Sequence, residues 1–132
     1  MRKLTVDSSV IVASLLPNEP RHNEAYRIWE SVLSGVNVAI MPYSVFVEVV
    51  AAVKRRTGSI ELSRAVMREL RRNQNIIFVD LDLKAAEESA EIAVKTGVRG
   101  MDAIVIQVAK DFGSEMITFD QEMMEKAKAA FD

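Results

Sequence analysis

The stretch KLTVDSSVIVASLL, residues 3–16, sets the pattern for the fold. Lys3–Val6 is a short apolar run of the kind that forms a strand, and it ends at Asp7. Ser8 or Ser9 can cap a helix that continues to the end of this stretch, where a proline stops it. A strand that passes through a short turn into a helix predicts the first unit of an alternating α/β fold.

The same alternation continues along the rest of the chain. The segment 43–56 is ambiguous, because its valines favour a strand, whereas its length, its basic last turn and Gly58 favour a helix. We interpret it as a helix. Apolar spacing and turn residues together predict helices at about 21–34, 43–56, 60–73, 84–96, 101–112 and 121–130, and strands at 36–41, 76–79 and 115–119.

This order of elements predicts the fold class. Strands that alternate with helices form a mainly parallel sheet with helices on both faces. We therefore expect an α/β fold, a three-layer α/β/α domain whose central sheet has four strands. The 132 residues contain no internal repeat and no linker, and the expected loops are short, so residues 1–132 are predicted to form a single domain.

The composition limits the chemistry. Hydrophobic residues make up 49% of the chain and charged residues 27%, which is typical of a soluble globular protein. The absence of cysteine excludes disulfides, thiolate zinc sites and cysteine nucleophiles, and it is natural for a cytoplasmic protein. Asp7 interrupts the N-terminal apolar stretch, which therefore does not resemble a signal peptide, and other apolar runs are too short to cross a membrane.

Two acidic residues follow predicted strands. Asp7 comes directly after the first strand and Asp120 directly after the fourth. Because the carboxyl ends of parallel strands share one edge of the sheet, and ligand sites form where the strand order reverses, these two carboxylates are expected to lie close together.

Two further acids lie at the borders of apolar helices. Glu48 is the only charged residue in SVFVEVVAAV, residues 44–53, where an unpaired carboxylate would be costly. Asp102 opens the helix MDAIVIQVA, residues 101–109, at the end where the helix dipole favours an anion.

Each of these acids also has an ordinary structural explanation. Asp7 and Asp120 could be turn or capping residues, Asp102 a first-turn helix residue, and Glu48 the partner of a buried arginine. Taken together, four clustered carboxylates need a counter-charge. All-oxygen ligands favour Mg²⁺ or Mn²⁺, either of which can activate water and polarise a phosphoryl oxygen. The set therefore predicts a metal site that hydrolyses nucleic acid.

At this point the sequence resembles the PIN-domain family, in particular the VapC toxins of VapBC toxin–antitoxin pairs. No single motif is specific, but the ordered set is, above all GVRGMDA followed by ITFD. The matching segments are LTVDSSVIVA (4–13), PYSVFVEVVAAVKR (42–55), TGVRGMDAIVIQVAKDFG (96–113) and MITFDQ (116–121).

The resemblance implies site residues, a cofactor and partners. It assigns Thr118 to a hydroxyl position that orients the site and Ser9 to a supporting polar role. Family members are typically Mg²⁺- or Mn²⁺-dependent ribonucleases, and the toxins usually form homodimers and bind a VapB-type antitoxin. The acidic catalytic and metal-binding positions of the family fall on Asp7, Glu48, Asp102 and Asp120.

One feature departs from the family pattern. Its members usually have a fifth short strand after the last helix, whereas this chain ends KAKAAFD, residues 126–132, with no β-type run. The acidic positions are unaffected, and the fifth strand is left open.

A basic segment lies between the acidic ones. Residues 54–72 carry seven basic side chains against two acids, a net charge of +5, which leaves −7 for the rest of the chain. Such a segment could bind RNA phosphates or be a solvated helix face. Its candidate RNA-binding residues follow one another at helical spacing: Arg64, Arg68, Arg71 and Arg72.

Two functions follow from these observations. The first is a metal-dependent endoribonuclease, the toxin of a type II toxin–antitoxin pair. The alternative is a catalytically inactive PIN-like module that binds RNA or protein. A phosphatase or nucleotide-binding domain is disfavoured, because the chain has no D-x-D-x-T, G-x-G-x-x-G or Walker sequence.

Overall fold

The computed structural model of the protein describes residues 1–131. Its centre is a parallel four-stranded sheet in the order β3-β2-β1-β4. Leu4 fixes the register of the central strand, because it pairs with Ala39 of β2 and with Glu115 of β4. The strands are β1 (Lys3–Val6), β2 (Val38–Pro42), β3 (Ile76–Val79) and β4 (Glu115–Ile117).

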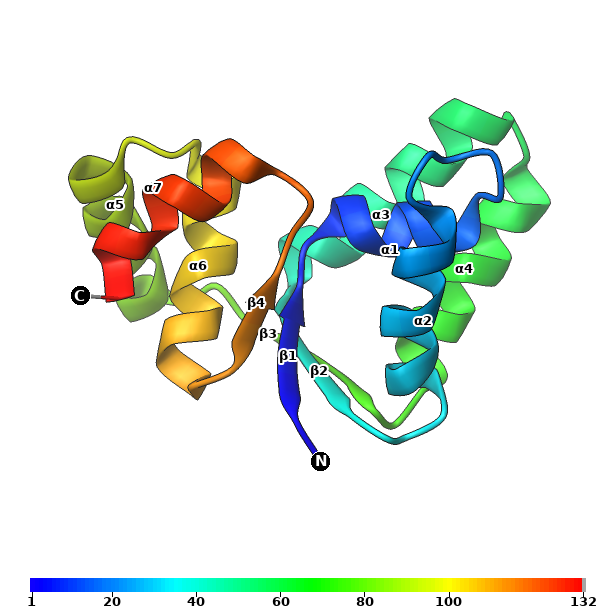
Figure 1. Cartoon of the computed structure of the whole chain (residues 1–132), viewed down its shortest axis with the longest axis horizontal. Coiled ribbons are helices and arrows are strands. Elements are labelled where there is room, and N and C mark those ends of the chain that lie inside the picture. The colour runs from blue at the N-terminus through cyan, green and yellow to red at the C-terminus, as the bar shows by residue number, and fades with distance from the viewer. Residues whose placement is uncertain (132) are drawn as a thin grey trace.

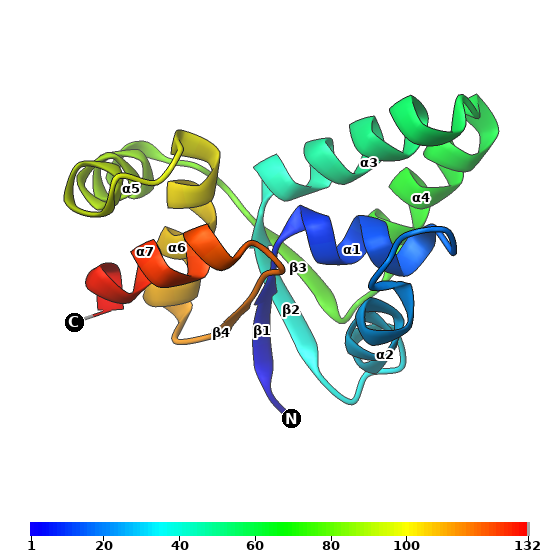
Figure 2. The ribbon, with the colours of Figure 1, turned by 45° about the horizontal axis from the view of Figure 1, so that its top comes forward.

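Seven helices cover the two faces of this sheet within the described residues. Figures 1 and 2 show α1, α2, α3 and α4 on one side of the strands, and α5, α6 and α7 on the other. The predicted three-layer α/β/α class is therefore confirmed, with no fifth strand in residues 1–131. The helices are α1 (Ser8–Leu15), α2 (His22–Leu33), α3 (Tyr43–Thr57), α4 (Ile60–Arg72), α5 (Leu83–Thr96), α6 (Gly100–Phe112) and α7 (Gln121–Phe131).

The ambiguous segment 43–56 is helical, as predicted, and its burial explains why. The buried side chains Val45, Val49, Ala52 and Val53 recur at helical spacing and face the core from one side of α3, whereas Val47 is exposed. The helix ends at Gly58, whose φ of +70° is accessible to glycine at little cost.

Two local predictions are wrong. The N-cap of α1 is Asp7, because Ser8 and Ser9 already lie inside the helix. β4 ends at Ile117 and not two residues later, because Thr118 leaves the strand and turns its hydroxyl toward Asp7. Both differences concern side chains of the candidate site.

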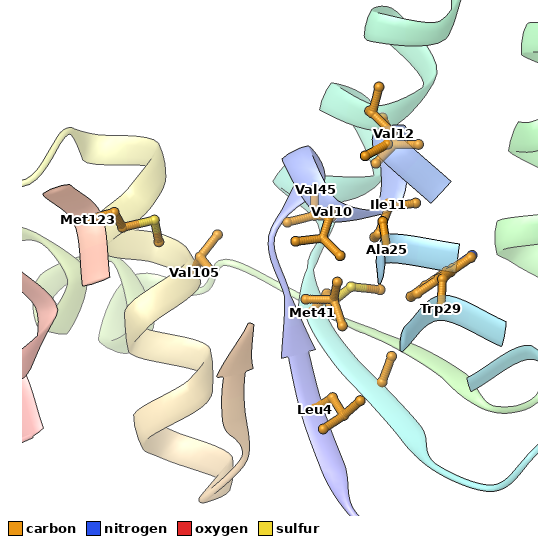
Figure 3. Packing of buried hydrophobic residues seen from close by; sticks show 14 of the residues in the cluster. Leu4, Val10, Ile11, Val12, Ala25, Trp29, Met41, Val45, Val105 and Met123 are labelled. Atoms are coloured by element: carbon orange, nitrogen blue, oxygen red, sulfur yellow. The ribbon is translucent and has the colours of Figure 1, made fainter. Parts of the chain in front are cut away.

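The hydrophobic core occupies both faces of the sheet. Figure 3 shows Val10, Ile11 and Trp29 on the side of α1 and α2, and Val105 and Met123 on the side of α6 and α7. Because β1 is central, its residues 4–6 are buried on both faces. None of the helices in residues 1–131 is both long and apolar enough to span a membrane.

The topology places the candidate site. From β1 the chain moves to β2 and then β3 with helices on one face, and it returns to β4 with helices on the other. The direction of winding therefore reverses beside β1, between the carboxyl ends of β1 and β4. Open α/β sheets bind ligands at such a reversal.

Candidate metal centre

Asp7 is held rigidly at the end of β1. Its backbone N–H donates to the carbonyl of Ile117 (2.9 Å), which joins the ends of β1 and β4. Its Oδ1 accepts the backbone N–H of Ser8 (2.9 Å), and its Oδ2 accepts the hydroxyl of Ser9 (2.9 Å). The side chain is 9% exposed, so these donors stabilise a buried carboxylate.

Thr118 connects Asp7 to Asp120. Its hydroxyl donates to Asp7 Oδ2 (3.0 Å) and accepts the backbone N–H of Asp120 (3.1 Å). The Oδ1 atom of Asp120 accepts the backbone N–H of Met123 (3.0 Å) and so caps the first turn of α7. The predicted supporting residues Ser9 and Thr118 thus contact Asp7, and the side chain of Asp120 is exposed.

Glu48 and Asp102 belong to helices on opposite faces of the sheet, α3 and α6, and they line one cavity together. Burial raises the pKa of Glu48, and the negative charges of Asp7 and Asp102 raise it further, against the lowering effect of Arg55.

Asp102 interacts electrostatically with two of the other acids. Burial raises the pKa of Asp102, as do the charges of Asp7 and Asp120, while Arg99 lowers it. The four acids predicted from the sequence therefore share one electrostatic environment, although Asp7 and Asp120 are 113 positions apart in the chain.

Two cavities have Asp102 in their linings. One, of about 580 Å³, is lined by Glu48, Asp102 and Arg99, together with small and apolar side chains of α5 and α6. The other, of about 280 Å³, is lined by Asp102, Arg99, Asp120 and the first residues of α7. A ligand at this edge can therefore contact three of the acids from solvent.

Comparison with known proteins identifies the family. The family model described as the PIN domain matches residues 4–129. The chain belongs to the PIN-domain family. No curated protein matches its sequence.

A solved structure supports the fold of this PIN domain. The chain is similar to the crystal structure of VapC20 of Mycobacterium tuberculosis, a toxin that cleaves the sarcin-ricin loop, with a TM-score of 0.78 and 20% sequence identity. The match covers 93% of each chain. At 20% sequence identity, the similarity to VapC20 supports the fold alone.

The donor set of the PIN domain fits a hard divalent cation in an open site. None of the four acids forms a salt bridge within residues 1–131, so their charge is left for a cation to neutralise. Over the same residues, no three acidic or histidine side chains are arranged to ligate one ion directly. A site with fewer than three direct protein ligands suits Mg²⁺, because this ion usually keeps several waters and binds one or two carboxylates plus substrate phosphates.

The predicted RNA-binding arginines lie elsewhere. Arg64, Arg68, Arg71 and Arg72 are exposed on α4, and none of them lines either cavity beside the acids. Arg71 instead borders a separate groove with Tyr43, Phe46 and Phe78. Their RNA-binding role stays a prediction.

Arg99 is a further residue of the site, although it is not among the predicted site residues. In the motif GVRGMDA it could equally neutralise a phosphate or form a structural salt bridge. It lines both cavities and forms no salt bridge within residues 1–131. Its position three residues before Asp102 is the only sequence signal for this placement.

Proposed function

We propose that this PIN-domain protein is a metal-dependent endoribonuclease that hydrolyses RNA phosphodiester bonds. The observation that carries the proposal is the convergence of four carboxylates at the reversal point of the sheet, where their mutual repulsion calls for a cation. Their proposed role is catalytic and metal-binding.

The proposed chemistry divides among named residues. A bound Mg²⁺ or Mn²⁺ would acidify a water molecule and neutralise charge on the phosphate. Asp7 would hold the ion, with its orientation fixed by Ser9 and Thr118, while Glu48 and Asp102 would hold it from the two flanking helices. In hydrolysis, the water oxygen bonds to phosphorus, the ester P–O bond breaks, and the leaving oxygen takes a proton.

The biological role is proposed from the resemblance and the fold. We infer that the protein is the toxin of a type II toxin–antitoxin pair, with a VapB-type antitoxin as partner, and that it acts as a homodimer on RNA in the cytoplasm. The resemblance to VapC toxins and the similarity in fold to VapC20 support this role. Growth arrest on expression, relieved by the product of an adjacent antitoxin-like gene, tests it.

The first prediction tests the proposed activity. Asp102→Asn should reduce Mn²⁺-dependent cleavage of an RNA panel by about 100-fold or more, because it removes a charged ligand without changing side-chain size. Asp111→Asn, the same change at the exposed end of the same helix, is the matched control and should retain activity. Equal cleavage by wild type and Asp102→Asn would contradict the assigned site.

The alternative is a PIN-like module that binds RNA or protein without catalysis. The presence of all four acids, Asp7, Glu48, Asp102 and Asp120, weighs against this alternative. The two functions differ in outcome: the binding module shows no metal-dependent cleavage of any RNA, and its binding is unchanged by Asp102→Asn.

A further inference from the structure

Arg99 lines both of the cavities beside the acids. It is the residue before α6, and its side chain makes no capping hydrogen bond to that helix. It is exposed and lines both cavities together with Asp102. Nothing in its local bonding therefore accounts for an arginine at this point of the chain.

The charge of Arg99 is available for a ligand. Arg2, Arg21 and Arg56 each form a salt bridge with a glutamate, whereas Arg99 has no such partner within residues 1–131. Lys126, the other cation lining the smaller cavity, pairs with Glu122 at 2.7 Å. Of the two cations that line the smaller cavity, Arg99 is thus the one that forms no salt bridge within residues 1–131.

A polyanion needs such a cation here. Four carboxylates repel RNA, and one or two bound divalent ions only reduce or cancel their charge, so no net positive charge is left for the phosphates that flank the scissile bond. A guanidinium suits this task, because its planar N–H groups bind two phosphate oxygens at once.

We propose that Arg99 binds an RNA backbone phosphate adjacent to the one that is hydrolysed. This inference rests on the proposed function, and it names the substrate contact of the same site. Arg99 is a substrate-binding residue in this account, and the strand passes along the two cavities that Asp102 lines.

A purely electrostatic role is the competing explanation. Arg99 lowers the pKa of Asp102, so its charge could serve only to offset the acids. In that case its removal would strengthen the attraction of the site for Mn²⁺ and leave the number of phosphate contacts unchanged. RNA affinity and its salt dependence therefore separate the two roles.

The test measures binding of a fluorescent single-stranded RNA in EDTA, where metal-dependent cleavage does not interfere, at NaCl concentrations between about 50 and 200 mM. Arg99→Gln should weaken binding about tenfold and reduce the slope of log K against log salt by about 0.7, the loss of one phosphate contact. Arg99→Lys should keep most of the slope but bind less tightly than wild type, because lysine binds phosphate as a point charge.

Arg27→Gln is the matched control. Arg27 is an exposed arginine on α2 that lies with Arg2 and Asn37 at the amino ends of the strands, away from the acids. The Arg27→Gln substitution removes the same charge from the protein as Arg99→Gln does, and the Arg27→Gln variant should bind RNA nearly as tightly as the wild type does. Circular dichroism should show all variants folded, because both arginines are exposed.

Several results would overturn the inference. The first is an equal effect of Arg99→Gln and Arg27→Gln on RNA binding. The second is an Arg99→Gln variant that binds Mn²⁺ more tightly than the wild type and binds RNA equally well. The third is a wild-type protein that does not bind RNA. The proposed function fails separately: RNA binding that depends on Arg99, in a protein that never cleaves RNA with Mn²⁺, would refute the nuclease activity and leave the Arg99 contact standing.

Discussion

Asp7 performs two tasks with one side chain. It caps the first turn of α1 through Ser8, and its other oxygen lies in the network of Ser9 and Thr118. Asp120 similarly caps α7 while it adds charge to the site. From sequence, capping and metal binding looked like alternatives for these residues, but a cap at the carboxyl end of a strand places a carboxylate at the ligand edge as well.

Thr118 should matter for metal affinity without binding the metal. Thr118→Val removes the hydroxyl that bonds Asp7 and the backbone of Asp120, at nearly constant volume. Loss of such an orienting contact typically costs about 10–100-fold in metal affinity. Titration with Mn²⁺ measures this, and Thr118→Ser, which keeps the hydroxyl, should retain most of the affinity. Unchanged affinity in Thr118→Val would contradict the role.

The acids should destabilise the metal-free protein at neutral pH. Because burial raises the pKa values of Glu48 and Asp102, folding favours their neutral forms, so their contribution to stability is present at low pH and lost as pH rises through the raised values. Glu48→Gln should therefore raise the free energy of unfolding at neutral pH, by up to about 1 kcal/mol because solvent screens these partly exposed charges.

Urea unfolding of wild type and Glu48→Gln in EDTA measures this difference. The gain should shrink on acidification to about pH 4, where the wild-type carboxyl is itself protonated. Added Mg²⁺ should stabilise the wild type more than the variant. A variant that is less stable than wild type at neutral pH without metal would contradict the account.

At the scale of elements, periodicity located the helices but not every end. The valines of α3 favour a strand locally, and the length of the segment, its basic last turn and Gly58 indicated a helix. The short β4 was predicted too long, because Thr118 and Phe119 are strand-forming residues. A tertiary hydrogen bond to Asp7, more than a hundred residues away in the chain, decides where that strand ends.

Gly58 should stabilise the end of α3 by its backbone conformation alone. A Cβ at this position would meet no atom within 4 Å, so the cost of Gly58→Ala comes from its φ of +70° and should be about 1 kcal/mol of unfolding free energy. Gly100→Ala is the matched control, because it lies in the first turn of α6 with no Cβ contact within 4 Å and no positive φ. Chemical denaturation of both variants measures this, and equal stabilities would contradict it.

At the scale of the whole molecule, the parallel sheet was predictable but its strand order was not. The shared carboxyl edge of a parallel sheet was enough to bring Asp7 and Asp120 together in the prediction. The approach of Glu48 from α3 and of Asp102 from α6 depends on how helices pack on opposite faces, which local patterns do not encode. The placement of Arg99 in the linings of two cavities depends on the same packing.

The central claim is that four carboxylates, from the ends of β1 and β4 and from α3 and α6, converge on one ion. The anomalous scattering of manganese in crystals grown with Mn²⁺ tests this claim most directly. We predict a peak at the carboxyl edge of the sheet, within ligand or water-bridged distance of Asp7, Glu48, Asp102 and Asp120, and its loss in Asp102→Asn. A wild-type crystal with no peak at this edge, or with its only peak away from these carboxylates, would contradict the account.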